Sequence, residues 1–425
     1  MLFNIFYLYA IAWSVILLLY AFQWSDLCIP LSTPVLLFVL FTIAIAVVLG
    51  YLYRNKLKFY KLKKNPHKPL VTLFFLLFYI ADFSCARYVP LFAVMAGYSH
   101  TSQDFHGVPW LHVLMMGVSI LYAFYLVYLY ACFKKKSLVW EFLLIFLYFL
   151  LMYQRQNMLI LLLGAAWILF ASVDFKKIEK STLLWICGNG IFFAFFVLFF
   201  FGVIGNTRYG SEWGWRDSSM ILELGKINDK WPAFLPHNFA WAYVYLVSPL
   251  SNLQCNYLAG VQAGASLLDA AWEFLPRYLT NFFPYSSGIH LELLEPSLFV
   301  CTAFAAIYRA MGMGGMYLLY FVEIALLVVV IEIVRRNKKL FVPFSVGLFY
   351  FFMMNFFDNP MVYEITSFMC LYPVLYVFFA FLKKKAIWCY EQLTDSTPIT
   401  TAKKTVGSKA STDAETKEKG TTKKS

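Results

Sequence analysis

Long apolar runs separated by short polar segments dominate the chain. A helix rises 1.5 Å per residue, so about 20 apolar residues cross the roughly 30 Å hydrocarbon core of a bilayer. Ten runs of this kind are predicted to be membrane-spanning helices: Leu2–Phe22, Pro34–Tyr53, Leu70–Ala96, Leu111–Phe133, Leu138–Tyr153, Met158–Val173, Thr182–Ile204, Met311–Val334, Phe341–Phe357 and Met361–Leu382. The runs are too long for the strands of a membrane barrel. The pattern therefore predicts an all-α, polytopic membrane protein.

The same pattern divides the chain into four parts. Residues 1–204 are predicted to form a membrane domain of seven helices, and residues 311–385 one of three helices. Residues 205–310 form one large segment between the seventh and eighth helices. Within it the apolar stretch Phe239–Leu250 is too short to span and is broken by Ser248-Pro249, which predicts an interfacial or re-entrant helix. Residues 386–425, rich in Thr, Lys and Ser, are expected to be a disordered basic tail.

Composition and charge agree with this architecture. The chain is 61% hydrophobic and only 14% charged, with a mean hydropathy of +0.67, whereas soluble domains carry roughly 25% charged residues. A soluble enzyme is thereby excluded. Of the 35 Lys and Arg residues, 27 lie in alternate loops of the ten-span arrangement or in the tail, which predicts cytoplasmic loops there and two cytoplasmic termini. Topology thus explains most of the net charge of +12, and nucleic-acid binding is not expected.

The basic residues on the opposite side are mostly arginines. Six of these eight are Arg87, Arg155, Arg208, Arg216, Arg277 and Arg309, whereas the cytoplasmic side has three arginines and 24 lysines. Topology requires only positive charge, so this choice of arginine indicates bidentate recognition of phosphate or carboxylate. The alternative is pairing with local acids, of which Asp82, Glu212, Asp217 and Glu273 are the candidates.

Other side chains of the large segment suit sugar binding or proton transfer. Its aromatic residues, among them Tyr209, Trp213, Trp215 and Tyr245, can stack on sugars or anchor helices at headgroup level. His237 and His290 are its only histidines, and each is either a general base or an ordinary surface residue. The sequence lacks HExxH, CxxC and Walker A motifs, so no metal, cofactor or nucleotide-driven transport is expected.

Several short motifs carry a family resemblance. They are Gln154-Arg155 in a tight outer hairpin, Thr207-Arg208-Tyr209-Gly210 after the seventh span, Tyr245–Asn252, and the approach to the eighth span over Phe299–Gly312. Arg277 is followed after ten residues by Gly288, an RX10G pattern. With the ten-span layout, these features resemble the oligosaccharide repeat unit polymerases, the Wzy-type O-antigen and capsule polymerases, up to about Leu382.

The resemblance implies a glycosyltransferase of the bacterial cytoplasmic (inner) membrane. Such an enzyme transfers the growing glycan from undecaprenyl pyrophosphate to the non-reducing sugar of a new lipid-linked repeat unit at the outer face. It implies Arg208, Arg216 and Arg277 as pyrophosphate ligands, with Arg155 and Arg309 nearby. It offers His237, Asp217 or Glu273 as the base, and Tyr209, Trp213, Trp215 and Tyr245 as sugar contacts. Membrane lipid, a chain-length regulator and a flippase are further partners to expect, and no metal is required.

Two other functions remain open. An O-antigen ligase would use the same lipid-linked donor and a similar layout but transfer the finished glycan to a lipid core. A flippase for the lipid-linked unit would line many helices with charge and keep short outer loops. Because the outer charge is concentrated in one long segment, the sequence favours an enzyme over the flippase.

Overall fold

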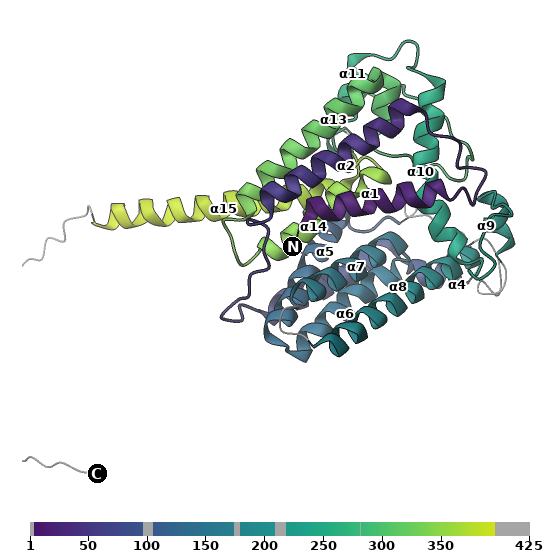
Figure 1. Ribbon diagram of the computed structural model, residues 1–425. Helices are drawn as coiled ribbons and strands as arrows, with labels where there is room; N and C mark the ends of the chain where they lie inside the picture. Colours follow the sequence, from purple (N-terminus) through teal and green to yellow (C-terminus); the bar gives the residue numbers. More distant parts are fainter. Residues whose placement is uncertain (1–3, 97–104, 174–178, 209–217, 281, 396–425) are drawn as a thin grey trace, which may run out of the picture. The chain divides into compact units, whose positions relative to one another are not determined.

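The computed structural model describes residues 4–96, 105–173, 179–208, 218–280 and 282–395. These residues form helices and loops with no β-strand, and one isolated antiparallel bridge joins Ser25 to Ile227. The helices are α1 (Ile5–Ala21), α2 (Thr33–Tyr53), α3 (Pro69–Ala86), α4 (Pro90–Met95), α5 (Leu111–Phe133), α6 (Lys136–Leu151), α7 (Arg155–Ala171), α8 (Lys180–Arg208), α9 (Ser219–Leu224), α10 (Phe239–Ala259), α11 (Leu267–Trp272), α12 (Arg277–Thr280), α13 (Phe304–Val334), α14 (Phe341–Met353), the 3₁₀ turn η2 (Met354–Phe356) and α15 (Glu364–Asp395) (Figure 1).

Six helices of the described part are long and apolar enough to cross a membrane. They lie in α2, α3, α5, α8, α13 and α15, and α1, α7 and α14 with η2 contribute shorter apolar helices. This confirms an all-helical, polytopic membrane protein. The chain divides into two compact units, Met1–Val377 and Phe378–Ser425, and the described residues of the second unit are the end of α15.

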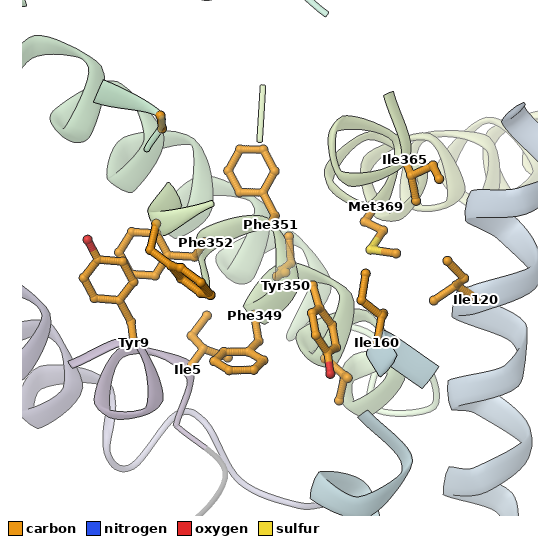
Figure 2. Packing of buried hydrophobic residues seen from close by; sticks show 14 of the residues in the cluster. Ile5, Tyr9, Ile120, Ile160, Phe349, Tyr350, Phe351, Phe352, Ile365 and Met369 are labelled. Carbon is orange, nitrogen blue, oxygen red and sulfur yellow. The ribbon is translucent and has the colours of Figure 1, made fainter. Parts of the chain in front are cut away.

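Aromatic and aliphatic side chains pack the helices of the first unit together. Helix α1 packs against α2, α10 and α14, while α5 packs against α6, α7 and α14 (Figure 1). The rings of Tyr9 on α1 and Phe352 on α14 stack with centroids 4.0 Å apart. Figure 2 shows Tyr9 of α1 beside Phe352 of α14, and Ile5 of α1 beside Phe349 of α14. Helix α14 therefore forms part of the core shared by α1 and α5.

The third predicted run is interrupted in the structure. Helix α3 ends at Ala86, and Arg87 takes a left-handed conformation with φ 63° before Pro90 begins α4. The proline fixes a new helix start, because its ring suits the first helical position and it lacks an N–H group. The expected continuous helix Leu70–Ala96 is therefore wrong beyond Ala86.

Helix α10 is longer and more regular than its sequence suggests. It runs without a break through Ser248-Pro249 for 21 residues, so the expected interruption is wrong. Proline removes only one backbone donor, and neighbouring helices can accommodate such a site. Nearly all of α10 is buried, and it packs against α8 and α13.

Two glycines let the end of α8 lie close to the start of α10. A Cβ on Gly202 would lie 2.1 Å from the carbonyl oxygen of Asn238, and one on Gly205 would lie 2.7 Å from the Trp241 ring. Beside them, Asn206 Nδ2 donates to Asn238 Oδ1 at 2.9 Å, and Trp241 Nε1 donates to Asn206 Oδ1 at 2.5 Å. This junction holds the last turn of α8, which ends at Arg208.

The junction predicts different effects for two glycine substitutions on α8. Gly202→Ala is expected to destabilise the protein by about 1–3 kcal/mol, because the methyl group meets the backbone of Asn238. Gly190→Ala is the matched control, since a Cβ there meets nothing within 4 Å. Thermal unfolding of the purified variants in detergent measures both effects. Equal midpoints for the two variants would show that α8 and α10 are not packed as described.

Candidate functional site

The loop after α10 is organised around one aspartate. Asp269 and Ser266 form a capping box at the start of α11. The Asp269 carboxylate also accepts hydrogen bonds from the Tyr285 hydroxyl at 2.6 Å and from Gly288 N–H at 2.9 Å. These hydrogen bonds, that of Tyr285 first, hold the pKa of Asp269 well below its usual range. Gly288, the end of the RX10G pattern, thereby helps to fix this loop.

The short α11 and α12 bring an acid and an arginine to a second loop. Glu273 is the C-cap residue of α11, Arg277 begins α12, and both contact the loop that follows η2. Asn359 Nδ2 donates to the backbone oxygen of Glu273 at 2.7 Å, and Arg277 N–H donates to Val362 O at 3.1 Å. Asp358, next to Asn359, interacts electrostatically with both Glu273 and Arg277. We call Glu273, Arg277, Asp358 and Asn359 the Glu273 cluster.

Both carboxyl groups of this cluster have raised pKa values. Burial first, and then the charge of Asp358, raise the pKa of Glu273 to about 7, against the opposing effects of Asn359 and Arg277. Burial likewise raises the pKa of Asp358. A carboxyl group that titrates near neutral pH can either donate or accept a proton under physiological conditions. The cluster therefore combines acid–base capacity with the exposed cation of Arg277.

A small cavity lies next to the cluster. Its walls are formed by Tyr245, Ser248, Ser297, Leu298, Phe299, Val300 and Phe357, the last of which adjoins Asp358. The rings of Tyr245 and Phe357 stack with centroids 5.9 Å apart. The cavity volume of about 30 Å³ holds water but no sugar ring. Tyr245, expected as a sugar contact, is thus half-buried in this wall.

Arg309 hydrogen-bonds to backbone oxygens of residues that do not belong to the Glu273 cluster. It is buried near the start of α13, where Nη1 donates to Gly260 O at 2.6 Å and Nε donates to His290 O at 3.2 Å. Its guanidinium thereby joins the end of α10 to the loop before α13. His290 takes part through its backbone oxygen.

The remaining predicted site residues are only partly described. His237 is exposed in the turn before α10, where its backbone oxygen accepts Ala240 N–H at 2.9 Å. Arg155 begins α7 and Arg208 ends α8, but their side chains lie outside the described residues. Five predicted residues lie outside the described residues altogether: Tyr209, Trp213, Trp215, Arg216 and Asp217.

Two contacts between polar residues could not be predicted from the sequence. Asp358 and Asn359 meet Glu273 from the loop between η2 and α15, and no local pattern links them. Asp82 meets His112, with Oδ2 and Nδ1 2.7 Å apart. Asp82 stands out in the sequence as an acid within an apolar run, but nothing in the spacing identifies His112 as its partner.

Neither a metal-binding group among the described residues nor a known relative indicates the role of these sites. Among the described residues, no group of three or more His, Cys, Asp and Glu side chains could hold a metal ion. Comparison of the chain with protein-family models, with curated proteins and with solved structures finds no match.

Proposed function

We propose that this protein is a polymerase that joins undecaprenyl-pyrophosphate-linked oligosaccharide repeat units into a surface polysaccharide. It would act at the outer face of the bacterial cytoplasmic membrane, with ten spans and both termini in the cytoplasm. The observation that carries the proposal is the Glu273 cluster, which joins an exposed arginine to a carboxyl group with a pKa of about 7. Glu273 and Arg277 belong to the large segment that charge distribution assigns to the outside, and Asp358 and Asn359 lie between the ninth and tenth predicted spans, on the same side.

The reaction sets the chemical tasks of the site. A hydroxyl oxygen of the acceptor sugar attacks the anomeric carbon of the donor glycan, and the bond between that carbon and the pyrophosphate oxygen breaks. The electron pair leaves with undecaprenyl pyrophosphate, so negative charge grows on the leaving group. Arg277 would stabilise this charge by paired hydrogen bonds, with Arg208 and Arg216 as further ligands in the same segment.

Glu273 suits the leaving-group side of this reaction. With a pKa raised to about 7, it is available in its protonated form near neutral pH and can donate a hydrogen bond beside Arg277. This role differs from the base expected from the sequence. The base must instead accept the proton of the acceptor hydroxyl. His237 and Asp217 remain candidates for it.

Deletion of the gene, followed by gel analysis of the surface polysaccharide, tests the proposed function. We expect the ladder of polymer lengths to collapse to a single repeat unit on its acceptor, with restoration by the plasmid-borne gene. Loss of all attached glycan would overturn the proposal. Polymer stranded on its lipid carrier would then indicate a ligase, and single units held on the cytoplasmic face would indicate a flippase.

A further inference from the structure

A buried aspartate near the end of α3 accepts three hydrogen bonds. Asp82 is fully buried; its Oδ2 accepts from the Tyr148 hydroxyl at 2.8 Å and lies 2.7 Å from His112 Nδ1, while Oδ1 accepts from Val108 N–H at 2.8 Å. Gly107 allows this approach, because a Cβ there would lie 2.1 Å from Oδ1. The carboxylate is therefore held rigidly between α3, α5 and α6.

Tyr148 is fixed in turn by its neighbours. Its ring stacks on Tyr79 with centroids 3.8 Å apart, and the Tyr79 hydroxyl donates to Ser119 Oγ at 2.8 Å. Tyr148 OH also lies 3.5 Å from His112 Nδ1. Asp82 and Tyr148 are thus the titratable groups that face the imidazole from α3 and α6 among the described residues.

This arrangement fixes the chemistry of His112. Because Asp82 can only accept at Oδ2, Nδ1 of His112 is the donor, and the lone pair of the neutral ring is on Nε2. The His112 side chain is 14% exposed, so the ring is mostly enclosed yet reaches the surface. A buried aspartate that fixes the tautomer of a histidine, and stabilises the imidazolium formed when Nε2 takes a proton, is the arrangement that hydrolase triads use.

An aromatic contact brings this histidine to the loop of the Glu273 cluster. Trp110, just before α5, stacks on Phe282 with ring centroids 5.4 Å apart and an interplanar angle of 14°. Phe282 follows α12, which begins at Arg277. The end of α5 that carries His112 therefore adjoins the loop that carries the arginine.

We propose that His112 is the base of the transfer reaction and that Asp82 and Tyr148 position it, an inference that rests on the proposed function. Nε2 takes the proton of the acceptor hydroxyl as its oxygen bonds to the anomeric carbon. The bond from that carbon to the pyrophosphate oxygen breaks, and its electron pair leaves with the lipid pyrophosphate. The exposed edge of His112 then releases the proton to water.

The test measures polymerisation by the purified full-length chain in nanodiscs, supplied with undecaprenyl-pyrophosphate-linked repeat units. His112→Asn keeps an N–H donor for Asp82 and removes Nε2, and we expect its rate to fall by roughly 10² to 10⁴. His106→Ala removes an exposed histidine six residues earlier and is expected to act as wild type. Asp82→Asn is expected to change the acidic limb of the pH–rate profile, which loss of stability alone would not do.

Three outcomes overturn the inference, and they are distinguishable. If wild type restores the polysaccharide ladder in the deletion strain and a stably inserted His112→Asn protein restores it equally, His112 is not the base while the polymerase function stands. If deletion leaves the ladder unchanged, the polymerase function fails, and the role of His112 fails with it. A wild-type rate in the nanodisc assay for both His112→Asn and Asp82→Asn would also exclude the role of this pair.

Discussion

Arg277→Lys is expected to lower polymerisation by about 10² to 10³ while the protein still inserts into the membrane. Lysine keeps the charge but loses the planar pair of donors that a pyrophosphate oxygen pair requires. Removing one preorganised donor to a developing anion costs about this factor in other enzymes. The backbone N–H of residue 277 still reaches Val362 O, so the loop is expected to keep its fold. Gel analysis of polysaccharide from the complemented deletion strain measures the effect, with immunoblotting for insertion.

Lys230→Gln provides the matched control for charge alone. Lys230 is exposed in the same segment, and its Nζ donates to Gln23 Oε1 at 3.3 Å. Its removal lowers the outer charge by one unit, which Arg277→Lys does not do, and we expect an unchanged ladder. Normal polymer from Arg277→Lys would refute the role of Arg277 as a bidentate pyrophosphate ligand. Equal losses in both variants would show that the effect is not specific to the donor geometry of Arg277.

The helices were predictable where length and hydropathy decide the structure. The predicted run Leu111–Phe133 has the same bounds as α5, and Pro34–Tyr53 differs from α2 by one residue. The errors fall at proline, at one left-handed residue and at two helix ends: α13 begins at Phe304 and not at Met311, and α15 continues to Asp395, past the expected start of the tail at residue 386. Whether Pro249 breaks a helix depends on what packs around it, and Arg87 gives no sign in sequence of its positive φ.

The sequence predicts which types of residue make up the site, but not which of them contact one another. Counting charges by side of the membrane identifies outer arginines, but it cannot show that Arg309 binds backbone oxygens of two loops. Glu273 was a candidate as an acid beside arginines. Its raised pKa depends on burial and on the charge of Asp358, a residue 85 positions later in the sequence. Such partners are set by tertiary packing, which a single sequence does not encode in any local pattern.

Wild type is expected to lose polymerisation above neutral pH, and Glu273→Gln is expected to remove this loss. If the protonated carboxyl donates to the leaving pyrophosphate, a pKa of about 7 makes wild-type activity fall roughly tenfold for each pH unit above 7. The glutamine amide keeps a donor at every pH, so at pH 9 the variant is expected to exceed wild type. The pH–rate profile of the nanodisc-embedded proteins measures this difference.

The protonation of Glu273 is also expected to make the stability of the protein depend on pH. The pKa of Glu273 is raised in the folded protein from 4.5 to about 7, so the folded state holds the proton more tightly than the unfolded state does. Stability is therefore expected to decline as pH rises from about 4.5 to 7, and Glu273→Gln should flatten this part of the curve of thermal midpoint against pH.

Asp358→Asn separates the roles of acid and base for Glu273. Removing the Asp358 charge lowers the pKa of Glu273, so the alkaline loss of activity is expected to begin at lower pH than in wild type. If Glu273 were instead the base, it would have to be deprotonated, and activity would rise with pH through its pKa. Glu273→Gln would then be inactive at every pH, and Asp358→Asn would extend activity to more acidic pH. The direction in which Asp358→Asn moves the profile therefore decides which side of the reaction Glu273 serves.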